Sequence, residues 1–303
     1  MSQQQIIIEE QGLRDRMQTI PINVEPEKKL LYIHQLIDAG IKRIQVASFV
    51  HPKLVPQMAD AELICTALPT NDSVIFSGLV LNVKGVERAI KAGLKHVAIS
   101  LSASNTHSIK NANTTIEAAK IAFKEMVLLA QNAGITVRGG IQCAFGCRYE
   151  GAIHPQIVYD LTQHHLDCGV TEIALADSTG MGNPLQIKSM LKKIKSFSGD
   201  TPIALHLHNT ENKGYANMMA AIESGVYQFD TAFGGLGGCP FIKGATGNIA
   251  TEDAVHLLHQ MNYSTGIDIN KVAAISKDFE KIMGAELPGL VYKLMDRSDI
   301  KMN

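Results

Sequence analysis

Short apolar runs alternate with longer amphipathic stretches along almost the whole chain. The short runs have the length and the apolar content of buried strands. Eight of them lie at residues 6–8, 44–47, 74–76, 96–100, 137–141, 172–176, 203–208 and 228–231. Between them apolar residues recur at helical spacing, as at 26–39, where Pro26 suits the first position of a helix. The pattern therefore predicts strands and helices in alternation.

Glycines mark the points where several of the predicted helices end. Five of these glycines are followed within a few residues by the next strand: Gly40, Gly93, Gly134, Gly169 and Gly225. Glycine is the usual residue just past the last helical turn, and such short connections are typical of α/β units. Eight strands, each followed by a helix, predict an α/β protein with a (β/α)8 TIM barrel. An open doubly wound sheet is the alternative, but no G-x-G-x-x-G follows the first strand.

The chain continues beyond the eighth strand for longer than one helix requires. Residues 251–260 and 271–284 are predicted as helices, and 285–303 as a tail that we expect to fold over the barrel mouth. No Pro- or Gly-rich linker divides the sequence. We therefore expect a single domain over residues 1–303, with 251–303 as a helical extension.

Composition narrows the class of protein. Of the 303 residues 46% are hydrophobic and 19% charged, and the formal net charge is -1, as in soluble globular enzymes. A net charge this close to zero produces no strong positive electrostatic potential that would attract nucleic acid or anionic lipid, so neither is expected as a partner. No run approaches the ~20 apolar residues of a membrane helix, and residues 1–5 do not resemble a signal peptide. Five scattered cysteines indicate reduced thiols and a cytoplasmic location.

Two histidines close the seventh predicted strand. Because side chains alternate along a strand, His206 and His208 share one face and are suited to chelate a divalent metal, although hydrogen-bonded core histidines are the alternative. In a barrel the carboxyl ends of the strands meet at the face that carries the active site. Asp15 and Asn248 can supply oxygen ligands there, unless Asp15 pairs with Arg14 and Asn248 is a turn residue. This ligand set favours Mg²⁺ or Mn²⁺.

Other polar residues fall at the same face. Cys239 follows a glycine-rich stretch and is either a proton donor or nucleophile, or a structural thiol. Arg14 is a cation for a developing negative charge, unless it is a surface residue. Asp177 is a candidate general base or a partner for other side chains. The remaining candidates, expected to contact substrate, are Gln45, Ser48 and Arg138.

Several motifs, in chain order, resemble the 3-hydroxy-3-methylglutaryl-CoA (HMG-CoA) lyase family of metal-dependent TIM-barrel enzymes. They are Arg14-Asp15, Ser48-Phe49-Val50-His51-Pro52-Lys53, Cys143-Ala144-Phe145-Gly146-Cys147, His206-x-His208-Asn209, Gly235-Leu236-Gly237-Gly238-Cys239-Pro240 and Gly244-Ala245-Thr246-Gly247-Asn248. The resemblance implies cleavage of this acyl-CoA to acetoacetate and acetyl-CoA, as in leucine degradation. It also implies a family tendency to form dimers, so a homodimer is one assembly to expect.

The resemblance also implies roles for individual residues. A divalent cation would be held by Asp15, His206, His208 and Asn248. Arg14 would stabilise the enolate of the departing acetyl-CoA, and Asp177 would assist at the substrate hydroxyl. Cys239 would donate or accept a proton on a loop that closes over the substrate.

The sequence departs from the family pattern in four ways. Arg16 replaces the glycine of R-D-G-L-Q, and Gln45 replaces a glutamate. Thr19-Ile20-Pro21 lacks an expected lysine, and Ala174 stands where serine is common. These departures leave two alternatives: a different 3-hydroxy-3-alkyl acyl-CoA as substrate, or a non-catalytic metal- or CoA-binding protein.

Overall fold

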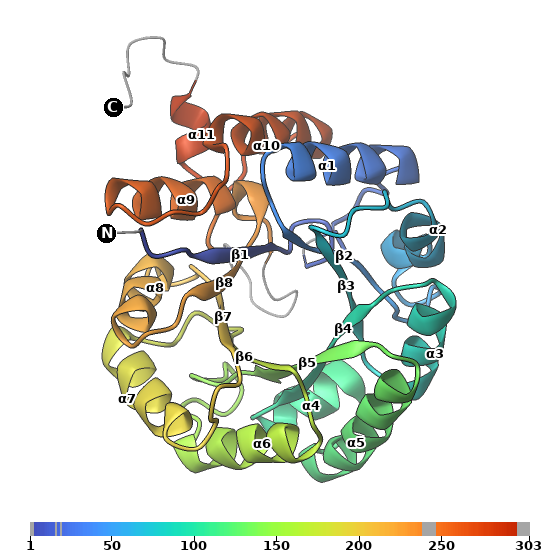
Figure 1. The fold of residues 1–303 in the computed structure, drawn as a ribbon, viewed down its shortest axis with the longest axis vertical. Helices are drawn as coiled ribbons and strands as arrows, with labels where there is room; N and C mark the ends of the chain where they lie inside the picture. The colour runs from blue at the N-terminus through green and yellow to red at the C-terminus, as the bar shows by residue number, and fades with distance from the viewer. Residues whose placement is uncertain (1–2, 16, 19, 238–246, 296–303) are drawn as a thin grey trace.

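The computed structural model describes residues 3–15, 17–18, 20–237 and 247–295. Eight parallel strands close into a barrel in sequence order, with β1 paired to both β2 and β8 (Figure 1). They are β1 (Ile7–Glu10), β2 (Arg43–Ser48), β3 (Ile75–Val80), β4 (His96–Ser102), β5 (Thr136–Gln142), β6 (Glu172–Asp177), β7 (Ile203–Leu207) and β8 (Gln228–Thr231). The predicted TIM barrel is confirmed.

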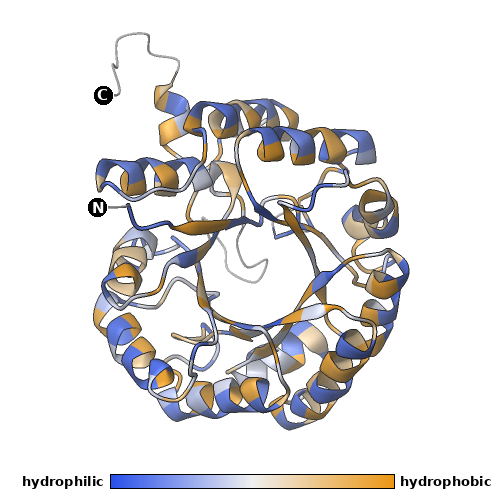
Figure 2. Cartoon of the chain, in the orientation of Figure 1, coloured by the Kyte–Doolittle hydropathy of each residue, from blue (hydrophilic) through white to orange (hydrophobic). Residues whose placement is uncertain are grey.

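Helices surround the barrel, and hydrophobic and hydrophilic residues alternate in bands along them (Figure 2). The apolar helix residues are largely buried and belong to the core that covers the strands. The main ring comprises α1 (Pro26–Asp38), α2 (Ala61–Thr66), α3 (Val83–Lys91), α5 (Ile116–Asn132), α6 (Pro155–Asp167), α7 (Pro184–Lys195), α8 (Gly214–Glu223) and α9 (Thr251–Gln260). Between β4 and α5 lies α4 (Asn105–Ala112), and two short 3₁₀ turns are η1 (Pro56–Met58) and η2 (Phe233–Gly235). No helix among the described residues is long and apolar enough to cross a membrane.

Local sequence signals set the helix boundaries. Pro26 begins α1, where a missing N–H costs no intrahelical hydrogen bond. The five glycines predicted to end helices all adopt positive φ, for example 95° at Gly40 and 72° at Gly134. This left-handed conformation turns the chain toward the next strand without a steric penalty.

The C-terminal segment lies at the outer edge of the barrel. Figure 1 shows α9, α10 (Ile269–Met283) and α11 (Val291–Leu294) together near β1, with α10 packed against α1. Between α10 and α11 the chain contacts the turn after β8, where Gly289 N–H donates to the Gly234 carbonyl at 2.9 Å. The C-terminal segment therefore supports the base of that loop.

The barrel interior is polar at its centre. Glu9 is in register with Arg43 and with Asp230 on the neighbouring strands, and Arg138 is in register with Glu172. These buried side chains form ion pairs, including Glu9–Arg43 at 2.9 Å and Arg138–Glu172 at 2.9 Å. Most of the outward-facing strand residues are apolar and form the main core under the helices. This layer of ion pairs lies directly beneath the site at the carboxyl ends of the strands.

Candidate metal centre and active site

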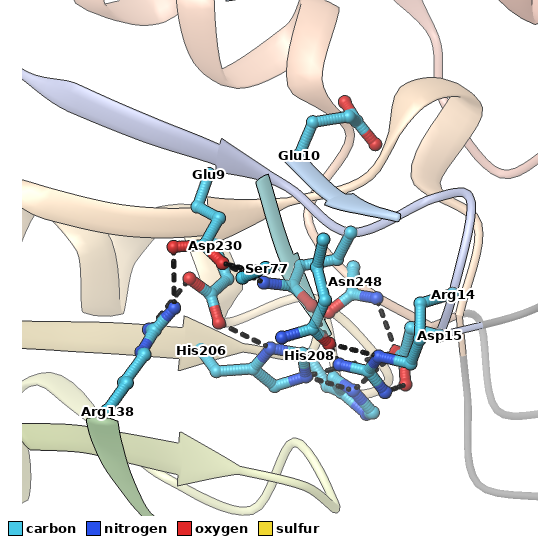
Figure 3. Close-up of polar contacts among 12 residues, drawn as sticks. Glu9, Glu10, Arg14, Asp15, Ser77, Arg138, His206, His208, Asp230 and Asn248 are labelled. Atoms are coloured by element: carbon cyan, nitrogen blue, oxygen red, sulfur yellow. Dashed lines mark hydrogen bonds and ion pairs between the residues drawn. The ribbon is translucent and has the colours of Figure 1, made fainter. Parts of the chain in front are cut away.

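Two histidines and one carboxylate meet at the carboxyl end of β7 and β1. His206 lies in β7 and His208 just after it, so strand alternation directs both rings to one side, and their Nε2 atoms are 3.1 Å apart. Asp15 comes from the turn after β1, and its Oδ2 lies 3.9 Å from His206 Nε2 and 3.8 Å from His208 Nε2 (Figure 3). These three residues could together hold a metal ion, and we call them the metal group. The pairing predicted from the H-x-H sequence is present.

Asn248 adjoins this group from the segment before α9. Its Nδ2 donates to Asp15 Oδ2 at 2.6 Å and to the Leu236 carbonyl at 2.9 Å. Its Oδ1 is buried and has no hydrogen-bond partner among the described residues. A buried oxygen without a partner is costly unless a ligand completes it. One carboxylate, two imidazoles and this amide oxygen make a donor set that fits a hard divalent cation.

Arg14 stands beside the metal group. Its Nη1 donates to Asp15 Oδ1 at 2.5 Å, its Nη2 donates to Gln11 Oε1 at 2.7 Å, and its Nε donates to Gln45 Oε1. Burial opposes ionisation of Asp15, but Arg14 and the two histidines together hold the pKa of that carboxyl well below its ordinary value. Asp15 is therefore an anion at neutral pH, next to a fixed guanidinium cation.

A cavity of about 620 Å³ opens above these residues. One side of it is polar and carries Arg14, Gln45, His206 and His208. The opposite side, from β4, β5 and β6, carries small side chains: Ala98, Ser100, Gly140, Ala174 and Ala176. The metal group thus lies in the wall of a pocket of the size that small-molecule sites require.

The chain matches the HMGL-like family over residues 5–279. The chain belongs to the HMGL-like family. It is 40% identical over 290 residues to (R)-citramalyl-CoA lyase of Chloroflexus aurantiacus, covering 92% of each protein. It is 35% identical over 283 residues to hydroxymethylglutaryl-CoA lyase YngG of Bacillus subtilis, covering 93% of this chain and 95% of the relative.

A solved structure extends the likeness to three dimensions. An HMG-CoA lyase from Acinetobacter baumannii, in complex with coenzyme A and 3-methylmalate, superposes with a TM-score of 0.93 at 36% identity. The superposition covers 98% of this chain and 97% of the other. Membership of the HMGL-like family, together with these relatives, supports a lyase that acts on a CoA ester.

Three further predicted residues lie at different depths in this HMGL-like barrel. Gln45 and Arg138 line the cavity, but the Arg138 guanidinium is occupied by Asp230, Glu9 and Glu172. Ser48 is fully buried in β2 and is not among the residues that line the cavity. Contact of either Arg138 or Ser48 with substrate remains a prediction.

Asp177 lies at the end of β6, behind the cavity wall. Its Oδ2 accepts from Gly182 N–H at 3.0 Å, while Oδ1 has no hydrogen-bond partner among the described residues. Burial raises the pKa of Asp177 to about 6, although the charge of His208 opposes the shift. Such a carboxyl can exchange a proton near neutral pH. Among the positions singled out in the sequence, Arg16, Thr19 and Cys239 lie outside the described residues.

The structure also reveals site residues that the sequence did not single out. Asp230 contacts His206, and Gln11 contacts Arg14. Glu10 and Glu252 are fully buried carboxyls that accept backbone N–H groups of Phe233 and Gly234 at the base of the loop after β8. The alternation of inward- and outward-facing residues along β1 and β8 could have indicated Gln11 and Asp230. Together with Glu9, these residues share the inward face of the barrel with His206.

Proposed function

We propose that this HMGL-like protein cleaves HMG-CoA to acetoacetate and acetyl-CoA. The observation that carries the proposal is the contact of Arg14 with Asp15, which places a permanent cation beside a metal-binding group in the wall of one cavity. Cleavage of the bond between C2 and C3 needs both the metal-binding group and the cation. A metal ion would assist loss of the C3 hydroxyl proton, and the Arg14 cation stabilises negative charge on the thioester oxygen.

Each group of the chain has a separate task in this proposal. Asp15, His206, His208 and Asn248 would hold a Mg²⁺ or Mn²⁺ ion, which when bound supplies a Lewis acid for the substrate hydroxyl. Asp177, whose pKa is raised to about 6, assists the loss of the hydroxyl proton from its position behind the cavity wall. Arg14 faces the thioester oxygen, where charge develops only in the transition state. Cys239 returns a proton to the acetyl-CoA carbanion.

A second candidate substrate is citramalyl-CoA, favoured by the 40% identity with the citramalyl-CoA lyase. Its carboxylate is attached directly to the carbon that bears the hydroxyl, one methylene closer than in HMG-CoA. Cleavage of the corresponding bond would release pyruvate in place of acetoacetate. The same residues serve both reactions, because the bond broken and the acetyl-CoA product are the same.

An assay with both thioesters tests the proposal. Purified protein is incubated with Mn²⁺ and either HMG-CoA or citramalyl-CoA, and acetyl-CoA, acetoacetate and pyruvate are measured. Acetoacetate formed with the higher kcat/KM supports HMG-CoA as the substrate, whereas faster release of pyruvate assigns the second candidate. Absence of acetyl-CoA above background from both thioesters would overturn the lyase proposal.

A further inference from the structure

The two histidines of the metal group differ in what holds the second nitrogen of each ring. His206 Nδ1 lies 3.1 Å from Asp230 Oδ2. His208 Nδ1 is buried and has no hydrogen-bond partner among the described residues. The sheet itself creates this difference, because His206 and Asp230 are register partners on β7 and β8.

Asp230 is in turn fixed from the barrel centre. Arg138 Nη2 donates to Asp230 Oδ1 at 2.8 Å, so the two carboxylate oxygens face different partners (Figure 3). Arg138 also pairs with Glu9 at 3.1 Å and Glu172 at 2.9 Å. Since all four side chains are at most 6% exposed, water cannot easily replace any of these contacts. Asp230 thus presents Oδ2 to the imidazole in a fixed direction.

This contact determines which nitrogen of His206 can bind a metal. A carboxylate only accepts hydrogen bonds, so the neutral imidazole carries its hydrogen on Nδ1 and donates it to Asp230. Nε2 then keeps its lone pair. That atom faces His208 Nε2 at 3.1 Å and Asp15 Oδ2 at 3.9 Å. The opposite tautomer would direct a hydrogen into the metal group.

We propose that Asp230 is a positioning residue of the metal centre, and that Arg138 acts through it. Asp230 selects the Nδ1–H tautomer of His206, orients the ring and increases the basicity of Nε2. The inference rests on the proposed metal-dependent function. It is specific to His206, because no described residue holds His208 in the same way.

The first test needs no substitution of Asp230. In metal-free wild-type protein, ¹⁵N NMR of the histidine rings, assigned with His206→Gln, should show neutral His206 protonated at Nδ1. The second test is Asp230→Asn, which should weaken Mn²⁺ binding measured by calorimetry about 10- to 100-fold. An asparagine can present its NH₂ to Nδ1, so His206 should shift toward the Nε2–H tautomer.

Glu172→Gln is the matched control. It removes a buried carboxylate from the same Arg138 but does not touch His206. If the contact with His206 is what matters, the Mn²⁺ affinity of this variant should stay within twofold of wild type. Its neutral His206 should also keep the hydrogen on Nδ1. An equal loss of Mn²⁺ affinity in both variants would show a structural role only and overturn the proposal.

Other outcomes are equally decisive. An Nε2–H tautomer in wild type overturns the proposal even if Asp230→Asn does not fold. Wild-type Mn²⁺ affinity in a folded Asp230→Asn variant also overturns it. These measurements use neither thioester, so a failure of the lyase assay and a failure of the Asp230 proposal are separate results.

Discussion

At the scale of single residues, the site depends on how Arg14 is held. One carboxylate, Asp15, and two amides, Gln11 and Gln45, accept its hydrogen bonds. The amides fix the guanidinium but do not neutralise it, so Asp15 is the single carboxylate that pairs with Arg14 among the described residues. Arg14 therefore competes with a bound cation for the electron density of Asp15.

A glutamate at position 45 should relieve this competition. In Gln45→Glu a second carboxylate pairs with Arg14, weakens its pull on Asp15 and adds negative charge to the site. Mn²⁺ affinity measured by calorimetry should rise by about 1 kcal/mol, roughly fivefold. Gln18→Glu is the control, because Gln18 lines the same cavity and its described hydrogen bond with Arg14 joins backbone atoms only. Weaker Mn²⁺ binding by Gln45→Glu would show that the amide is an adaptation of this site.

Individual roles were predictable from the sequence only where a pattern isolates them. His206 and His208 stand out because strand alternation puts two imidazoles on one face. Asp230 did not, because its role depends on the register between β7 and β8, which a single sequence does not specify. Glu252 did not stand out either, because acidic residues are common in the first turn of a helix, and its full burial is visible only in the structure.

At the scale of elements, η2 and α9 form a support for the loop after β8. Glu252 in α9 accepts from Gly234 N–H at 3.0 Å and from the Ser276 hydroxyl in α10 at 2.8 Å. Glu10 accepts from Phe233 N–H at 3.0 Å from the other side. Burial raises the pKa of Glu252 to about 8 and that of Glu10 to about 7. The loop is thus anchored by carboxyls that favour their protonated form.

This anchoring gives the stability a defined pH dependence. Between pH 4.5 and 8 folded Glu252 retains a proton that the unfolded chain has lost, so its stabilising contribution falls as pH rises and is gone above pH 8. Glu252→Gln stays neutral throughout. From pH 6 to pH 9 wild type should lose about 3 kcal/mol more unfolding free energy than Glu252→Gln, measured in urea.

Glu117→Gln supplies the control for this pH series, because its side chain is 81% exposed. Its unfolding free energy should follow wild type across the pH range. Curves that run parallel for wild type and Glu252→Gln would show that Glu252 ionises normally in the folded protein.

Strands β4, β5 and β6 together determine how much space the cavity offers. Ser100, Gly140 and Ala174 are register neighbours on these strands, and all three line the cavity. A TIM-barrel interior is normally filled by bulky branched residues, so these small side chains leave space opposite the polar wall. The wall should admit a 3-alkyl branch longer than the methyl group of HMG-CoA.

Ser100→Leu tests this prediction. The kcat/KM ratio of the 3-propyl homologue over HMG-CoA should fall at least about tenfold, since even one misplaced methylene can cost that much in a packed pocket. Ser100→Ala is the matched control, because it removes the hydroxyl without adding volume, and it should keep the wild-type ratio. A ratio that Ser100→Leu leaves unchanged would place the branch elsewhere.

At the scale of the whole molecule, the barrel was the most predictable feature. Eight apolar strands, helices at regular spacing and glycine stops all point to the same topology, and agreement among such signals is what specifies a fold. The buried ion pairs of Glu9, Arg43, Arg138 and Glu172 were not predictable in the same way. They depend on closure of the barrel, which brings β1 beside β8 and lets side chains from opposite strands meet across the interior.

Closure also links the metal group to global stability. Asp15 follows β1, the histidines belong to β7 and its end, and Asn248 precedes α9, so a bound cation would join segments more than 190 residues apart in the sequence. A ligand that binds only the folded state stabilises it by about 2.7 kcal/mol at 100 times its dissociation constant. For a protein of this size the melting temperature should therefore rise by about 5 °C in saturating Mn²⁺ and return with EDTA.

The double variant His206→Ala/His208→Ala decides whether that rise comes from the proposed centre. His206 borders the cavity with a side chain 12% exposed, and His208 lies beside it, so the substitutions enlarge the cavity and do not open a closed void in the core. The variant should fold in EDTA and show no rise with Mn²⁺, because Asp15 and Asn248 without the two imidazoles retain little affinity for the cation. A rise equal to that of wild type would place the stabilising cation at another site and leave the two histidines to some other purpose.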